Sequence, residues 1–145
     1  MPLPTLIAPS CDHADVTSFI SHTTVDCADA YALSRWWQQV LDYVEDADDP
    51  NLPGHEECLI MSRDEAHKVL FIEVPDAKQV KNRMHFDLRP ADGTREEELE
   101  RLIELGAKPV HDLRRPDGTG WVTLADPEGN EFCILRSLAE VAATA

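Results

Sequence analysis

The chain has 145 residues and a mass of 16.2 kDa, which fits one domain or two small similar halves that share a core. Lys and Arg number 13 against 28 Asp and Glu, so the formal net charge is -15. This charge repels phosphate backbones and anionic lipids, and it argues against nucleic-acid and membrane-surface binding. Hydrophobic residues are 43% and charged residues 28%, which excludes a collagen, a coiled coil or a wholly disordered chain.

The cysteine pattern and the N-terminus indicate a cellular compartment. Cys11, Cys27, Cys58 and Cys133 are scattered, and no two of them form a Cys-x-x-Cys motif. Scattered cysteines in an acidic chain of this size are typical of a reduced cytoplasmic protein. The first ten residues contain three prolines and neither Lys nor Arg, unlike a signal peptide. We therefore expect a cytoplasmic location and a poorly structured N-terminal tail over residues 1–17.

The first half of the chain predicts a strand, a helix and two more strands. Residues 20–26 are rich in β-branched types, which favours a strand. Asp29 can cap a helix in which apolar side chains, including two tryptophans, recur every three or four residues up to Val44. So wide an aromatic stripe predicts tight packing against the sheet of this half. A loop at residues 46–54 precedes two predicted strands at residues 58–61 and 69–74.

The same order of elements then recurs. Residues 83–88 alternate polar and apolar types, as a half-buried strand does. Thr94 and Glu97 form a capping box for a helix that ends at Gly106. Turns rich in Pro, Asp and Gly separate the extended segments that follow, and these lie at residues 108–113, 120–124 and 131–135. Residues 139–145 are expected to be a C-terminal tail.

Single residues support an internal duplication. His22 precedes an Ala-Asp pair by six residues, and His85 precedes another such pair at the same distance. His85 lies 63 residues after His22, so both units fit after the tail. The matched order of elements makes duplication a better interpretation than chance.

Four stretches together carry a family resemblance, and they are residues 26–29, 82–88, 105–107 and 121–135. The most specific of them contains the turn Asp-Pro-Glu-Gly-Asn at residues 126–130. Over about residues 18–138 the chain resembles the vicinal oxygen chelate superfamily, which includes glyoxalase I, bleomycin-resistance proteins and extradiol dioxygenases. Its glyoxalase-like domain proteins are the nearest match. The resemblance implies an α+β fold of two tandem β-α-β-β-β modules, residues 18–78 and 80–137, whose curled mixed sheets enclose a shared cavity.

The resemblance also implies a metal site. Metal-using members place one ligand on each of four strands, and His22, Glu73 and His85 fall on the first three positions. Cys133 occupies the fourth, where those members have Glu. A thiolate there would favour zinc among divalent metals such as zinc and nickel, whereas a packed core cysteine would supply no ligand. If His22 and His85 bind one ion, their nitrogens should lie within about 4.5 Å.

Other side chains are expected near this site. Asp26 shares a strand face with His22, and Asp87 shares one with His85, so each could line the pocket or orient an imidazole. Trp121 is expected in the pocket wall. Glu131 is the candidate catalytic residue, because a carboxylate near the site could move a proton. The remaining histidines have no partner pattern and are expected at the surface: His13, His55, His67 and His111.

Two functions stay open at this stage. One is a glyoxalase-like small-molecule enzyme with lyase or isomerase-type chemistry next to a chelating oxygen pair, in which a divalent metal stabilises the developing charge. The other is a metal-free protein that binds or sequesters a small molecule, as bleomycin-resistance proteins do. The substitution at Cys133 favours the second. Expected partners are a small-molecule ligand and, because the superfamily often dimerises, a second copy of the chain, but neither nucleic acid nor membrane.

Overall fold

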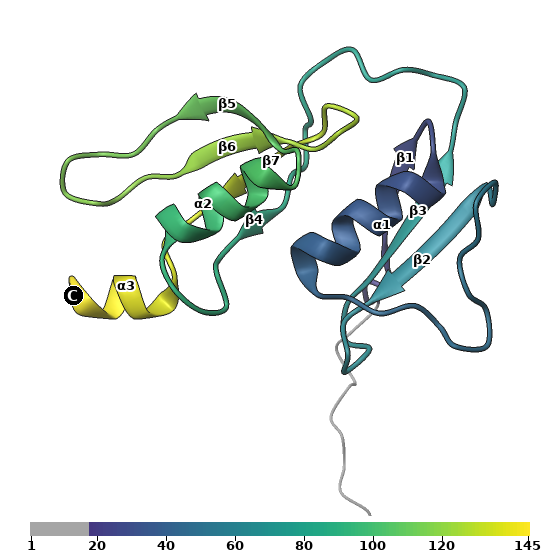
Figure 1. The fold of residues 1–145 in the computed structure, drawn as a ribbon, viewed down its shortest axis with the longest axis horizontal. Coiled ribbons are helices and arrows are strands. Elements are labelled where there is room, and N and C mark those ends of the chain that lie inside the picture. The colour runs from purple at the N-terminus through teal and green to yellow at the C-terminus, as the bar shows by residue number, and fades with distance from the viewer. Residues whose placement is uncertain (1–17) are drawn as a thin grey trace, which may run out of the picture.

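The computed structural model describes residues 18–145, so the tail expected at residues 1–17 lies outside the described part. The first half forms a three-stranded sheet in the order β1-β3-β2, covered on one face by helix α1 (Figure 1). Its elements are β1 (Thr23–Cys27), α1 (Ala30–Leu41), β2 (Glu57–Met61) and β3 (Lys68–Glu73). β1 runs parallel to β3, and β2 runs antiparallel to it.

The second half forms a four-stranded sheet in the order β4-β7-β6-β5. Its elements are β4 (Asp87–Leu88), α2 (Arg95–Glu104), β5 (Lys108–Asp112), β6 (Val122–Ala125) and β7 (Glu131–Ile134). Here too the first strand, β4, runs parallel to the last, β7, and the other pairs are antiparallel. The α+β fold with two mixed sheets is therefore confirmed.

The two halves match in topology, except that the first half has a single bridge in place of one strand. After α1, the place that β5 holds in the second half is taken by a single bridge between Val44 and Met61. Asp42 adopts a left-handed conformation with φ 53°, so α1 ends at Leu41 and Val44 becomes extended instead of helical. The duplication expected from the sequence is thus visible in the strand order, although the first half keeps only three full strands.

Several element boundaries differ from the predictions. The strand expected over residues 83–88 is only Asp87–Leu88, although the Phe86 carbonyl just before it accepts a hydrogen bond from the Cys133 N–H of β7 at 2.9 Å. The Asn82 N–H donates to the Glu131 carboxylate, and the Glu131 N–H donates to Asn82 Oδ1. Helix α3 (Leu138–Ala143) occupies most of the expected C-terminal tail, and Ser137 caps it. No helix in the described part of the chain is long and apolar enough to cross a membrane.

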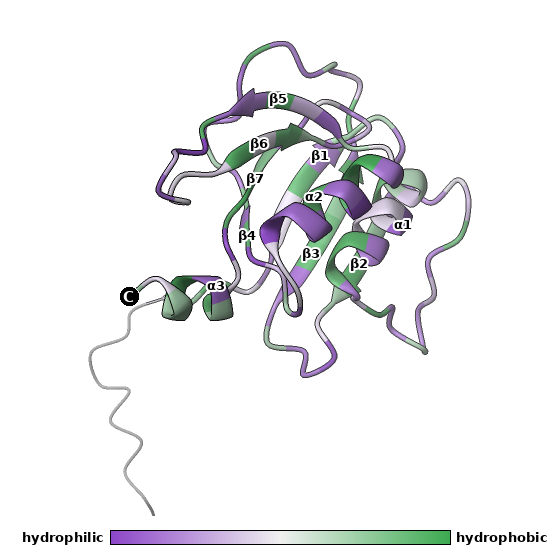
Figure 2. Ribbon diagram, turned by 60° about the vertical axis from the view of Figure 1, so that its left-hand side comes forward, coloured by the Kyte–Doolittle hydropathy of each residue, from purple (hydrophilic) through white to green (hydrophobic). Residues whose placement is uncertain are grey.

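One hydrophobic core joins the halves through α1. Figure 2 shows β3 and β6 as largely hydrophobic and α2 as mostly hydrophilic, as expected for sheet centres and a surface helix. Trp36 and Trp37 both pack edge-on against Phe132 of β7, and Trp37 also packs against Phe86. The tight packing expected for this helix is present, but its aromatic contacts belong to the second half and not to the sheet of its own half.

The turn at residues 126–130 links the second half to α1 through hydrogen bonds. The buried carboxylate of Asp126 accepts hydrogen bonds from Trp37 Nε1 at 3.0 Å and from Asn130 Nδ2 at 2.9 Å. The Glu128 carboxylate accepts from the backbone N–H of Ala28 at 2.6 Å and of Asp29 at 3.3 Å. These donors stand just before α1, where an anion is also favoured by the helix dipole.

Replacing Glu128 with alanine should therefore weaken the joint between the halves. We expect Glu128→Ala to lower the free energy of unfolding by about 1–2 kcal/mol, as for the loss of a helix cap. Glu100→Ala removes the same charge from an exposed position of α2 and should change the stability by less than about 0.5 kcal/mol. Urea denaturation of both variants measures the difference, and equal losses would show that the Glu128 contacts do not hold the halves together.

Candidate functional site

A cavity of about 640 Å³ lies between β1, the segment of residues 74–86 that links the halves, and the turn between β6 and β7. Residues 23–26 of β1 form one wall, and most of segment 74–86 forms another. In Figure 1 this segment arches between the two halves before it enters β4. The volume is in the range of small-molecule sites in proteins. One strand, the linking segment and a turn therefore form the walls, and the expected enclosure of a shared cavity by two curled sheets is not confirmed.

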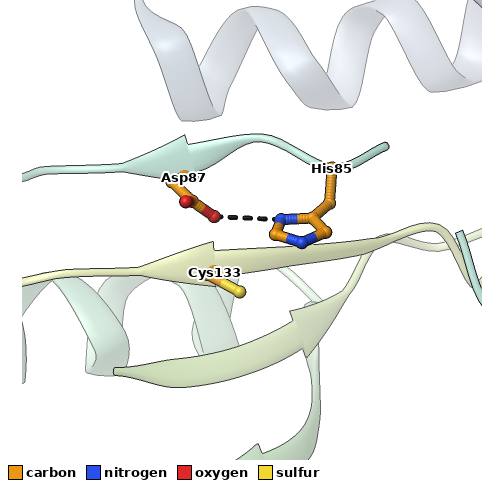
Figure 3. Close-up of side chains that lie close together, drawn as sticks. All are labelled: His85, Asp87 and Cys133. Carbon is orange, nitrogen blue, oxygen red and sulfur yellow. Dashed lines mark hydrogen bonds and ion pairs between the residues drawn. The ribbon is translucent and has the colours of Figure 1, made fainter. Parts of the chain in front are cut away.

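His85 and Asp87 form a pair at this cavity. His85 lines the cavity just before β4, and its Nδ1 lies 3.0 Å from Oδ1 of Asp87 in β4 (Figure 3). A carboxylate bonded to Nδ1 fixes the orientation of the ring and leaves Nε2 for a proton or a ligand. The two side chains meet because residues two apart in an extended chain share a face.

Cys133 lies on β7 directly beside this pair. The parallel register places Cys133 opposite Asp87, and the cysteine is 6% exposed. Its Sγ lies 3.6 Å from Thr123 Oγ1 on β6. Burial raises the pKa of the Cys133 thiol above its usual range. The hydrogen bond with Thr123 lowers it by less, and the negative charge of Asp87 raises it further. The free side chain is therefore a neutral thiol at pH 7.

The donor atoms of His85, Asp87 and Cys133 lie within 4.8 Å of one another, and they are the one such group in residues 18–145. Figure 3 shows Asp87 and Cys133 on the neighbouring strands β4 and β7 and His85 on the chain just before β4. An imidazole, a carboxylate and a thiolate are all ligands of zinc, and three protein ligands leave a fourth position open. The set fits a zinc-like ion better than Mn²⁺, which prefers oxygen ligands.

His22 and Glu73 lie outside this group. His22 precedes β1, is exposed, and has its Nδ1 3.1 Å from the Ser21 hydroxyl. In the parallel register Glu73 stands opposite Cys27, whereas Val69 stands opposite Thr23. Glu73 therefore lies beside the C-terminal end of β1, whereas His22 precedes the N-terminal end. The two ends of β1 are four residues apart, or about 13 Å. The four-strand set expected from the resemblance is not assembled within one chain.

The residues expected to line the pocket have separate positions. Asp26 lines the cavity from β1, and Asp87 contacts His85 without lining it. Trp121 stands outside the cavity lining and is 37% exposed.

Glu131 lines the cavity but is already paired. Its carboxylate lies 3.1 Å from Lys78 Nζ and accepts the Asn82 N–H at 3.0 Å. Burial raises the pKa of Glu131, but the hydrogen bonds from Asn82 and Lys78 outweigh it, so the pKa is lowered overall. A carboxylate with a lowered pKa is a weak proton acceptor. These contacts favour a role in holding the cavity wall.

His67 is half-buried, in contrast to the surface position expected from the sequence. Its Nδ1 lies 2.7 Å from the Tyr43 hydroxyl, and its Nε2 lies 3.4 Å from Thr23 Oγ1. Its ring also packs edge-on against Phe86, which lines the cavity. His55 and His111 are exposed, and His13 lies outside the described residues. The partners of His67 are distant in the chain, so no local pattern in the sequence indicates them.

Two mixed sheets with matching strand order define a two-module α+β protein, and His85 lies at the wall of its cavity. The model of the glyoxalase-like domain family matches residues 22–135. The chain therefore belongs to the glyoxalase-like domain family, within the vicinal oxygen chelate superfamily. No curated protein matches the sequence.

Solved structures support the fold. The fosfomycin resistance protein FosX from Listeria monocytogenes is 17% identical, with a TM-score of 0.64 over 90% of this chain and 100% of that one. FosX from Mesorhizobium loti is 19% identical, with a TM-score of 0.60 over 88% of this chain and 99% of that one. TioX from Micromonospora sp. ML1 is 18% identical, with a TM-score of 0.52 over 81% of this chain and 98% of that one. A variant of the Listeria protein was solved with Mn(II) and a dihydroxypropylphosphonic acid.

Proposed function

We propose that the protein binds a small organic molecule in the cavity beside His85 and acts on it as a glyoxalase-like enzyme of the lyase or isomerase type. The observation that carries this proposal is the His85–Asp87 pair at the wall of a cavity of about 640 Å³. An imidazole held in this way can act as a general base and then as a general acid. Family membership supports the same class of chemistry.

A metal ion, if used, would be held by His85, Asp87 and Cys133. Bound there, a zinc-like ion would polarise a substrate oxygen and stabilise negative charge. Cys133 would bind as a thiolate, because a divalent cation deprotonates a coordinating thiol in spite of its raised pKa. His22 and Glu73 have no place in this group within one chain.

Without a bound ion, the protein's own side chains divide the work. His85 Nε2 removes a proton from the bound molecule and returns it at a neighbouring atom, while Asp87 stabilises the imidazolium formed in between. Glu131 stays paired with Lys78 and holds segment 74–86 in place. The apolar side chains of Trp37 and Phe86 in the cavity lining limit the access of water.

The second candidate function is metal-free binding or sequestration of a small molecule. It is favoured by the state of Cys133, which is a neutral, buried thiol that packs against Thr123. Lys81 supports it too, because its positive charge acts on Cys133 and opposes the binding of a cation there.

Removing the imidazole of His85 distinguishes the proposed enzymatic function from metal-free binding of a small molecule. Against a panel of 2-oxo and 2-hydroxy carbonyl compounds in deuterated water, the wild type should incorporate deuterium next to the carbonyl, as followed by NMR. His85→Gln should slow this exchange by at least about a hundredfold, the usual contribution of a general base. His111→Gln changes an exposed histidine outside the cavity and should leave the rate unchanged. Ligand binding without any exchange in the wild type would favour the second function.

A further inference from the structure

Segment 74–86 brings an unusual concentration of positive charge to the cavity. Three of the chain's 13 Lys and Arg residues, Lys78, Lys81 and Arg83, stand within six residues of this segment, and all three line the cavity. The chain as a whole carries a formal net charge of -15. Most of its surface therefore repels anions, and segment 74–86, with three cations and one acid, is a local exception at the cavity wall.

Two of these cations have no partner in the described residues. Lys78 is neutralised by Glu131 at 3.1 Å and also donates to the Val80 carbonyl at 2.7 Å. Lys81 and Arg83 take part in no ion pair of residues 18–145. They stand four and two residues before His85, so their charge belongs to the same stretch of wall as the reactive histidine.

The acidic residues of the cavity do not cancel this charge locally. Asp126 is buried and its carboxylate is directed at Trp37 Nε1 and Asn130 Nδ2, whereas Glu131 is neutralised by Lys78. The two remaining acids are separated, since Asp26 lies on β1 and Asp76 lies at the beginning of segment 74–86. Lys81 and Arg83, in contrast, are only two residues apart.

Apolar side chains alternate with the cations along the same wall. Val80 is 78% exposed and Met84 is 88% exposed, and both line the cavity. Exposed apolar side chains beside unpaired cations suit a ligand that has an apolar body and an anionic end. A guanidinium can bind a carboxylate or phosphonate through two parallel hydrogen bonds, and an ammonium adds a point charge.

We propose that Lys81 and Arg83 bind the anionic group, a carboxylate or a phosphonate, of an otherwise apolar ligand that reaches His85. This inference rests on the proposed function of the cavity and names its substrate class. The anionic group lies against Lys81 and Arg83, and the apolar body lies against Val80, Met84 and Phe86.

Two dyes that differ by one anionic group test the proposal. 1-Anilinonaphthalene-8-sulfonate and N-phenyl-1-naphthylamine share the same apolar body, but only the first carries a sulfonate. We expect the anionic dye to bind at least about tenfold more tightly, and its affinity to fall as salt is added. The double variant Lys81→Met/Arg83→Met should lower the affinity for the anionic dye by about a hundredfold, or about tenfold per charged hydrogen bond. The affinity for the neutral dye should not change.

Lys108→Met provides the control, because it removes one positive charge from an exposed position of β5 outside the cavity and should leave both affinities unchanged. Displacement of the anionic dye by phenylphosphonate and by phenylacetate tells the phosphonate from the carboxylate, and neutral benzyl alcohol should displace it only weakly. Equal affinities for the two dyes, or no effect of the double variant, would overturn the anion site while the cavity stays a binding site. Failure of both dyes to bind would overturn the proposed function and this inference together.

Discussion

Replacing Trp37 with alanine is expected to lower the free energy of unfolding by about 3–5 kcal/mol, the usual cost of removing a buried tryptophan. Trp37 is 3% exposed and packs against Trp36, Phe86 and Phe132. Its contacts join α1 to the second half, so the variant loses part of the core that unites the molecule. Urea or guanidinium unfolding, monitored by circular dichroism, measures the loss.

Two further variants identify the source of the effect. Trp37→Phe keeps an aromatic ring but removes the N–H bonded to Asp126, and it should cost about 1–2 kcal/mol, because Asn130 still donates to that carboxylate. Trp121→Ala removes a tryptophan that is 37% exposed and should cost about 1 kcal/mol or less. A loss below about 1 kcal/mol for Trp37→Ala would mean that α1 does not unite the halves.

The elements that local chemistry determines were predictable from the sequence. The Thr94–Glu97 capping box is present, and its two reciprocal hydrogen bonds begin α2 where the sequence indicates. Gly106 has a φ of 106° after the last turn of α2, a conformation that glycine adopts without strain. The Asp29 cap and the apolar stripe of α1 are likewise local patterns, and the helix follows them up to Asp42.

The site depends on strand register, which no local pattern determines. The family resemblance points to Glu73 as a ligand on the last strand of the first module, but the pairing of β3 with β1 puts it opposite Cys27. The pairing of β4 with β7, in contrast, puts Asp87 opposite Cys133, and the His85–Asp87 contact follows from their two-residue spacing. Contacts such as that between His67 and Tyr43 form only once distant segments have packed.

Replacing Cys133 with glutamate should have opposite effects with and without metal. Without metal, the new carboxylate is buried beside Asp87 and is expected to cost several kcal/mol, about the cost of a buried, unpaired polar group. With Ni²⁺, Co²⁺ or Mn²⁺, a set of His85, Asp87 and Glu at position 133 offers the oxygen ligands that these ions accept. Added metal should therefore raise the melting temperature of Cys133→Glu by several degrees, whereas the wild type should respond to Zn²⁺ and only weakly to Mn²⁺.

Cys133→Ser and Cys58→Glu complete the comparison. Cys133→Ser is close in size, should fold, and should lose the response to Zn²⁺ because a hydroxyl is a poor ligand for that ion. Cys58→Glu places a carboxylate at a buried cysteine outside the donor group, so any loss of stability there should not be reversed by metal. If the wild type shows no response to Zn²⁺ and metal does not rescue Cys133→Glu, Cys133 is a core residue. The cavity would then work without a metal, through the His85–Asp87 pair alone.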